Sequence, residues 1–178
     1  MGGSDVARLL LRGVIGGTMI AHGLRHARTL RGTAGWFSSI GFQQPRAQAA
    51  ASAVVEVGAG AALVVGATTP LAASAVVGTM GVAARSVHLR NGFFVVDEGY
   101  EFVLNLAVAS VALAALGPGR LSVDRLAGWD QWRTGRQRAA FAAGLGVLAA
   151  AGQLAAFWRP ADGGGRAVSA DHGTEENA

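Results

Sequence analysis

The chain has 178 residues, of which 51% are hydrophobic and 15% charged, and it contains no cysteine. Without cysteine the chain cannot form disulfides, ligate an iron–sulfur cluster or carry out thiol exchange by itself. The net charge is +4, and all 15 basic residues are arginines spread over the segments between apolar runs, which fits membrane-flanking charge better than nucleic-acid binding.

Five apolar runs predict membrane-spanning helices, because a bilayer core about 30 Å thick needs about twenty apolar residues and soluble helices of that length would show a charged face. The runs cover about 6–25, 49–67, 71–88, 101–116 and 139–158. No clear signal-peptide cleavage site follows the first run, so we expect it to remain as an anchor. Within it, Gly13 and Gly17 have the small-xxx-small spacing that allows close helix approach. The predicted fold is an all-α membrane protein with a four-helix core and a fifth, C-terminal transmembrane helix.

The segments between the runs predict the remaining organisation. Residues 27–48 contain a Trp- and Phe-bearing stretch that we expect to form a short helix in the membrane interface. The predicted divisions are 1–126 for the four-helix membrane domain, 127–138 for a basic interfacial linker, 139–158 for the additional helix and 159–178 for a disordered polar tail. All four tryptophans fall at or near predicted span ends, as in an aromatic belt. Arginines are balanced between the two faces, so the membrane orientation stays open.

Ionisable residues of four predicted spans converge on one membrane face. The first and third spans end on the face where the second and fourth begin, which places His22, His88 and Glu101 near it. Glu56 in the second span lies about 10 Å below that surface at 1.5 Å per residue. Because an intramembrane carboxylate usually faces a partner or a cavity, we predict a polar site with Glu56, His88 and Glu101 as catalytic residues. The alternative is that these groups only stabilise helix packing.

Neighbouring residues extend this predicted site. Arg25 and Arg85 share helix faces with His22 and His88 at i, i+3, although either arginine could extend to the headgroups instead. Asn105 lies one turn after Glu101. The predicted ligand-contacting residues are His22, Arg25, Arg85, Asn91, Phe93, Tyr100 and Asn105. His26 is expected to face water at headgroup level.

A pocket for a small polar head group, such as a quinone ring, fits these residues best. Quinone carbonyls accept hydrogen bonds, His and Glu can relay protons, and Phe93, Phe94 and Phe102 would line the ring. A haem held by two histidines fits less well because nothing in the flanking sequence requires it. A metal site of two His and two Glu is also less favoured, because the sequence has no helical Glu-x-x-His pair.

Several segments together resemble one family. They are Ala21-His22-Gly23, Gly35-Trp36-Phe37, Gly41-Phe42, Glu56, His88-Leu89-Arg90-Asn91-Gly92-Phe93-Phe94, Gly99-Tyr100-Glu101 and residues 117–124. From about Leu9 to Leu126 the chain resembles the DoxX family. The resemblance implies a four-helix core in the bacterial inner membrane, related to the small membrane subunit of archaeal thiosulfate:quinone oxidoreductase, and mycobacterial relatives in a complex with a sulfurtransferase and a superoxide dismutase. It implies functional roles for His22, Glu56, His88, Asn91, Tyr100 and Glu101. The fifth apolar run and the basic linker depart from the family pattern.

These observations predict a membrane subunit of a redox complex, linked to quinone or to thiol and oxidative-stress balance, that works with a soluble redox partner. Two alternatives stay open: a non-catalytic protein for membrane assembly or partner docking, and a small transporter. The transporter is less favoured because the spans show no inverted repeat. The sequence predicts contact with the lipid bilayer and leaves open whether the chain forms a homo-oligomer.

Overall fold

The computed structural model describes residues 2–160, and the chain there is almost entirely helical. Its α-helices are α1 (Gly3–Arg28), α2 (Leu30–Ser39), α3 (Pro45–Val65), α4 (Thr69–Ala83), α5 (Glu101–Leu116), α6 (Val123–Leu126) and α7 (Gly135–Phe157). A π-helical turn, η1 (Ala84–His88), continues α4 and is followed by the 3-10 turns η2 (Leu89–Asn91) and η3 (Val95–Asp97). The predicted core of four long helices, the fifth C-terminal helix and the short helix after α1 are all confirmed.

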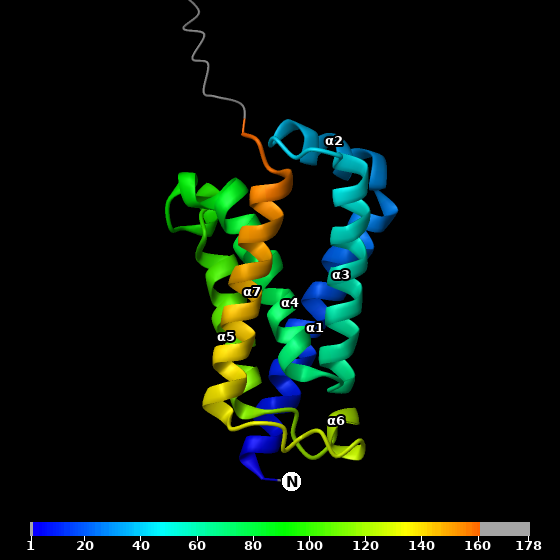
Figure 1. Ribbon diagram of the computed structural model, residues 1–178, viewed down its shortest axis with the longest axis vertical. Coiled ribbons are helices and arrows are strands. Elements are labelled where there is room, and N and C mark those ends of the chain that lie inside the picture. The colour runs from blue at the N-terminus through cyan, green and yellow to red at the C-terminus, as the bar shows by residue number, and fades with distance from the viewer. Residues whose placement is uncertain (1, 161–178) are drawn as a thin grey trace, which may run out of the picture.

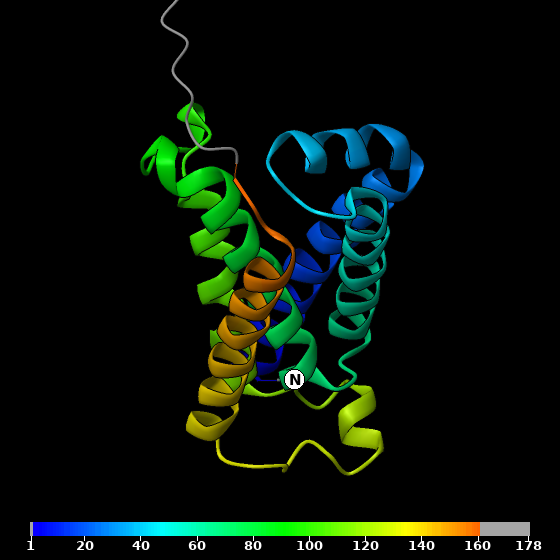
Figure 2. The ribbon, with the colours of Figure 1, turned by 45° about the horizontal axis from the view of Figure 1, so that its top comes forward.

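The five long helices run along the long axis of the molecule (Figure 1). The N-terminus, α6 and the start of α7 lie at one end, called here the α6 end, and α2 and the turns after α4 lie at the other, called the α2 end (Figures 1 and 2). The chain alternates direction as predicted, so the C-terminal part of α1 and the His88-bearing turn lie at the same end. This end therefore collects most of the polar residues predicted for the site.

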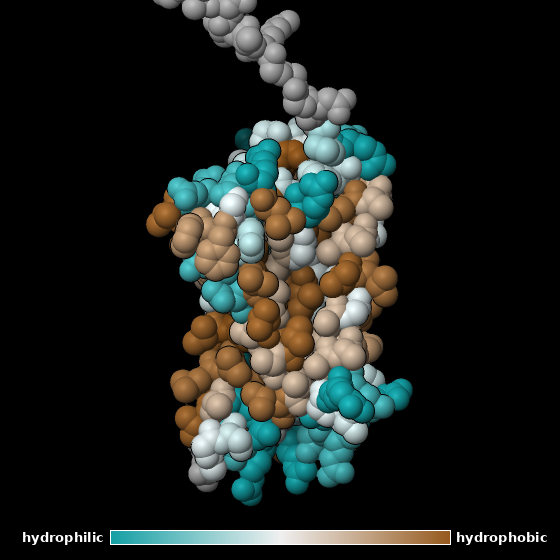
Figure 3. Space-filling model, turned by 90° about the vertical axis from the view of Figure 1, so that its left-hand side faces the viewer, coloured by the Kyte–Doolittle hydropathy of each residue, from teal (hydrophilic) through white to brown (hydrophobic). Residues whose placement is uncertain are grey.

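The bundle has the surface of a membrane protein. Among the described residues, α3, α7 and α4 with its 3-10 extension (69–91) are each long and apolar enough to cross a bilayer, whereas the apolar α5 is shorter. The 26-residue α1 is long enough, but Arg8 and Arg12 lower its hydropathy. On the face shown in Figure 3, apolar residues cover the middle of the molecule between two polar ends. Its exposed leucines and valines can face lipid at no cost.

Helices α1 and α3 touch through glycine. A Cβ atom on Gly60 would lie 2.6 Å from the Gly16 carbonyl oxygen, and one on Gly23 would lie 2.9 Å from the Ala53 carbonyl oxygen. These glycines allow the two backbones to approach, as small residues do in membrane helix pairs. The prediction placed this contact at Gly13 and Gly17, but both of those glycines have open space around them. The contact face is therefore rotated from the predicted one.

The fifth long helix is part of the bundle. Helix α7 packs mainly along α4, where Gly146 meets Val77. Its C-terminal end is tied to the α2–α3 connection, because the Trp158 indole N–H donates to the Ile40 carbonyl (2.8 Å) and the Arg159 N–H donates to the Gly41 carbonyl (2.8 Å). Of the predicted disordered tail, residues 159–160 are held in this way, and 161–178 lie outside the described residues.

Two buried charges organise the α6 end. The Arg12 guanidinium donates to the carbonyls of Leu63 (2.9 Å) and Val64 (2.7 Å) at the end of α3. It also donates to the carbonyls of Pro118 (3.0 Å) and Leu121 (2.6 Å) in the loop after α5. The two α3 carbonyls lie in the last turn of the helix, where few N–H groups of the helix remain to bond them.

Asp124, the second of these buried charges, belongs to α6 and caps the start of α4. Its carboxylate accepts from the backbone N–H groups of Thr68 (2.6 Å) and Thr69 (2.8 Å), where α4 begins. A carboxylate at this position satisfies unpaired N–H groups and the positive end of the helix dipole. Asp124 thereby fixes α6 to the start of α4. Arg12 fixes the loop between α5 and α6 to the end of α3.

Candidate functional site

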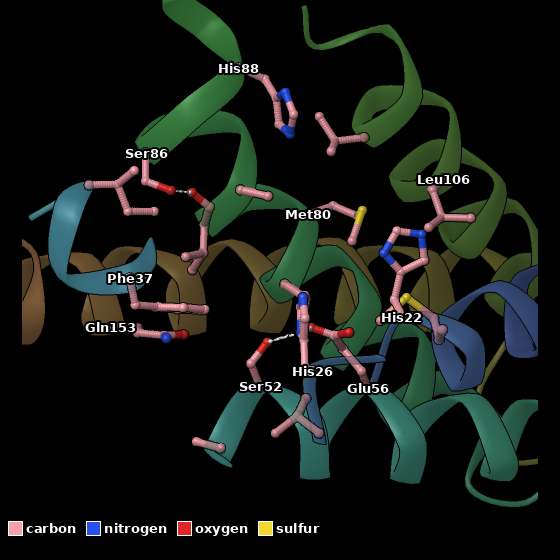
Figure 4. Close-up of a pocket in the computed structure, with 18 of the residues that line it drawn as sticks. His22, His26, Phe37, Ser52, Glu56, Met80, Ser86, His88, Leu106 and Gln153 are labelled. Atoms are coloured by element: carbon pink, nitrogen blue, oxygen red, sulfur yellow. Dashed lines mark hydrogen bonds and ion pairs between the residues drawn. The ribbon is translucent and has the colours of Figure 1, made fainter. Parts of the chain in front are cut away.

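A cavity of about 360 Å³ lies between α1, α2, α3, α4 and α5, and α7 contributes Gln153 to its wall (Figure 4). Most of the wall is apolar, and the polar groups come from different helices. The polar lining residues are Thr18, His22, His26, Ser52, Glu56, Thr79, Ser86, His88 and Gln153. A concave, mostly apolar pocket of this size with a few convergent polar groups is typical of a site for a small organic molecule.

Glu56 is the buried acid of this cavity, with only 3% of its surface exposed. Its Oε1 atom accepts from the Ser52 hydroxyl and lies 3.2 Å from the Nδ1 atom of His26. Its Oε2 atom is buried and has no hydrogen-bond partner among residues 2–160. Because an unpaired buried carboxyl oxygen costs free energy, Oε2 is the atom best placed to bind a ligand or carry a proton.

Glu56 lies farther from the start of its helix than the apolar run suggests. Helix α3 begins at Pro45, before that run. Glu56 is therefore eleven residues into the helix, or roughly 16 Å along its axis at 1.5 Å per residue. The acid lies near the middle of its span.

His26 belongs to the cavity, contrary to the expectation that it faces water. Helix α1 continues through Arg28, so His26 stays helical and lies one turn after His22 on the same side. Its ring contacts both Glu56 and the Ser52 oxygen, the latter at 3.3 Å. Because the single Ser52 proton goes to Glu56, Ser52 can only accept from His26, and the Nδ1 atom of His26 carries a proton. The i, i+4 spacing of His22 and His26 is the sequence feature that indicates this position, because residues four apart lie on the same side of a helix.

His22 and Phe102 form an aromatic part of the wall. Their ring centroids are 6.2 Å apart and their planes differ by 25°, which is a stacked arrangement. Both residues line the cavity. The pair presents a flat aromatic surface to the cavity, and the ring nitrogens of His22 lie next to the Phe102 ring.

His88 reaches the cavity from the π-helical turn η1. Its Nδ1 atom lies 2.6 Å from the Glu98 carbonyl oxygen. A carbonyl oxygen only accepts, so Nδ1 carries the proton, and in the neutral imidazole Nε2 is left as an acceptor. Turns of this kind often occur at functional sites.

The same turn separates His88 from Arg85. The prediction placed both on one face at i, i+3, which holds for an α-helix. In the wider π turn, the Arg85 guanidinium instead lies 4.6 Å from the ring centroid of Trp158, as a cation–π contact. Arg85 does not line the cavity.

Other predicted residues also lie outside the cavity wall. Glu101 accepts from the Val95 N–H (3.0 Å), and Asn91 contacts the Glu98 carbonyl (3.4 Å), so both order the loop before α5. Arg25 and Asn105 are exposed. Of the predicted site residues, the wall contains His22, Glu56 and His88; it does not contain Arg25, Arg85, Asn91, Phe93, Tyr100, Glu101 or Asn105.

Of the three phenylalanines predicted to line a quinone ring, one lies in the cavity wall and two lie outside it. Phe93 packs edge-on against Phe94 (5.4 Å between ring centroids) and Tyr100 (5.5 Å), away from the cavity. Phe102 alone of the predicted phenylalanines reaches the wall, which also contains Phe37 and Phe42. Within residues 2–160, no group of three or more His, Asp or Glu residues could hold a metal ion.

Comparison with known proteins identifies the family. The DoxX family model matches residues 7–89, which span α1 to the start of η2 and contain His22, His26, Ser52, Glu56 and His88. Searches of curated proteins and of solved structures gave no match. The family match ends before the loop to α5, so the longer resemblance to Leu126 stays a prediction. Residues 7–89 are therefore a DoxX family region of this membrane protein, and this region provides the histidines and the acid of the cavity.

Proposed function

We propose that this protein is the membrane subunit of a redox complex and that its cavity binds a quinone, which is reduced with electrons from a soluble partner. The observation that carries the proposal is the Oε2 atom of Glu56, which is unpartnered among the described residues and buried at the wall of a mostly apolar cavity. A quinone ring is flat, apolar and bordered by two carbonyl oxygens, so it complements such a wall. The stacked His22–Phe102 pair supplies a surface for the ring.

The residues support proton transfer but not electron storage. Reduction of a quinone to a quinol requires two electrons and two protons, and both carbonyl oxygens become hydroxyl groups. The electrons come from the partner, because a chain without cysteine has no thiol to oxidise. One proton passes through the Glu56–His26 pair and the other through His22, which also lines the cavity. The Nε2 atom of His88 accepts a hydrogen bond from a quinol hydroxyl.

The α2 end is the proposed docking face for the partner. The loop from Leu89 to Tyr100 lies there (Figure 2), and the His88 contact with Glu98 connects it to the cavity wall. A partner on this loop would be close to the bound ring. The proposal also requires a membrane that contains quinone, for which the family resemblance indicates the bacterial inner membrane.

The test compares two acids that differ in location. The chain is purified in mild detergent from its native membrane, and co-purifying proteins and quinone are identified by mass spectrometry. Partner-dependent quinone reduction is then measured for Glu56→Gln and for Asp130→Asn, a control acid at the α6 end, outside both the cavity and the docking loop. Since general acid–base catalysis contributes about 10²–10⁴-fold, the Glu56→Gln rate should fall by about 100-fold or more, and the Asp130→Asn rate should stay near wild type. Unchanged rates in Glu56→Gln would refute the proposal.

The same variants distinguish an assembly role. If Glu56 only fixes helix packing, Glu56→Gln should lower the yield of folded protein and of recovered complex together. The rate per folded complex would then stay constant. Rates are therefore normalised to folded complex, measured by size-exclusion chromatography in detergent.

A further inference from the structure

A second hollow lies at the α6 end, on the other side of the bundle from the histidine cavity. It has a volume of about 340 Å³ and is formed by the start of α4, by α6, by the linker that joins α6 to α7, and by Phe141 of α7. Its lining residues are Thr68, Pro70, Leu71, Asp124, Trp129, Trp132 and Phe141. Five of these seven are aromatic or apolar. We call this hollow the linker groove.

The groove has a large apolar surface that the chain leaves uncovered. Trp129 is 62% exposed, Trp132 is 44% exposed and Leu71 is 53% exposed. Trp132 is fixed in place by an edge-on contact with Phe141, with ring centroids 5.3 Å apart. Tryptophans with an apolar ring and a polar N–H favour the membrane interface, where acyl chains meet head groups.

The rim of the groove is cationic. Residues 120–138 contain five arginines and two aspartates, a net charge of +3. Both aspartates are occupied: Asp124 caps α4, and Asp130 pairs with Arg125 (2.5 Å). Arg138 donates to backbone carbonyls, among them that of Ala114 (3.0 Å).

Arg133 lies against the aromatic wall of the groove. Its guanidinium lies 5.5 Å from the ring centroid of Trp132, and the residue is exposed. The two carboxylates of this segment are already engaged, so neither competes for this guanidinium. An exposed guanidinium beside an apolar hollow matches a phosphate joined to an acyl chain, and guanidinium groups bind phosphate through paired hydrogen bonds.

We propose that the linker groove binds one anionic phospholipid, with its phosphate at Arg133 and an acyl chain against Leu71, Trp129 and Trp132. The charge of the rim selects an anionic over a zwitterionic head group. The apolar wall selects a lipid over a free phosphate ion. The bound lipid would hold the linker at the membrane surface and cover the apolar area that the protein itself leaves open.

The test is native mass spectrometry of the full chain released from detergent. Phosphatidylglycerol and phosphatidylcholine with identical acyl chains are titrated in separate experiments. Wild type should bind phosphatidylglycerol about tenfold more tightly, which corresponds to about 1.4 kcal/mol. Both lipids offer a phosphate to Arg133, but only phosphatidylcholine also brings a quaternary ammonium group, which the cationic rim repels. Arg133→Ala should abolish this preference, and Leu71→Trp should weaken both lipids by filling the groove. Arg90→Ala, at the opposite end, should behave as wild type.

Each remaining outcome has a defined meaning. Equal binding of both lipids to wild type overturns the proposal, as does an unchanged preference in Arg133→Ala or an unchanged affinity for both lipids in Leu71→Trp. Displacement of bound lipid by inorganic phosphate at similar concentrations overturns the acyl-chain contact. If Arg133→Ala fails to fold, Arg133→Lys replaces it. This variant keeps the charge without the planar donor pair, and it should retain only part of the preference.

Discussion

Arg12 offers the clearest test of how the bundle is held together. It is 3% exposed, and its guanidinium makes four hydrogen bonds to carbonyls of α3 and of the loop after α5. Replacing Arg12 with Met keeps an apolar stem of similar length and removes every donor. At about 1 kcal/mol for each bond, Arg12→Met should lower the free energy of unfolding by about 4 kcal/mol. This is a large part of the roughly 5–15 kcal/mol that stabilises most proteins.

Two further variants separate hydrogen bonding from charge. Arg12→Lys keeps the charge but has three donors on one atom, which cannot reach carbonyls on both sides, so about half of the stability should be lost. Arg136→Ala, at an exposed position of α7, should stay within about 0.5 kcal/mol of wild type. Denaturant titration in detergent, followed by tryptophan fluorescence, measures all three. A loss below about 1 kcal/mol in Arg12→Met would refute the reasoning.

Three other substitutions test separate contacts by the same unfolding measurement. Asp124→Ala removes the cap of α4 and should cost about 1–2 kcal/mol; an unchanged midpoint would mean that water replaces the cap. Gly60→Val places a branched side chain against the Gly16 carbonyl and should cost more than about 2 kcal/mol, whereas the open position in Gly17→Val should tolerate the change. Gln153→Leu leaves the buried amide of Gln48 without its 2.9 Å partner, so a loss of about 1 kcal/mol is expected; equal stability would contradict it.

The number and order of the long helices could be predicted because each long hydrophobic run forms one helix. Each run long enough to span a bilayer became a long helix, and the Trp-containing stretch after α1 became α2. The alternation of spans also predicted that His22, Glu56 and His88 would meet, and all three line one cavity. Direction and spacing along a helix follow from its geometry alone.

The positions of His26 and Arg85 depend on where a helix ends and on its local geometry, which amino-acid composition does not determine. The apolar run ends at Arg25, which favours a water-facing His26, but α1 continues through Arg28 and turns His26 toward Glu56. The i, i+4 spacing of His22 and His26 is the sequence signal for this change. Arg85 shares a face with His88 only in an α-helix, and nothing in the local sequence indicates the π turn that the chain forms there.

Hydrogen-bond partners of individual side chains could not be predicted from the sequence either. Arg12 has the sequence context of an ordinary membrane-flanking arginine, yet its hydrogen-bond partners are 51 to 109 residues away. Glu101 begins a span at the expected end of the bundle, but its carboxylate turns back to the Val95 N–H in the preceding loop. The end of a bundle where a residue lies can be predicted from sequence, whereas the direction of its side chain depends on packing between helices.

The central claim is that the cavity of Glu56 and the three histidines binds a quinone. The most direct measurement is photolabelling of the protein in native membranes with an azidoquinone, followed by peptide mapping by mass spectrometry. The account predicts label on cavity-lining segments of α1, α3 and α5, lost when excess unlabelled quinone is present and reduced in Glu56→Gln. Label confined to lipid-facing residues of α7, or label that unlabelled quinone does not displace, would contradict it.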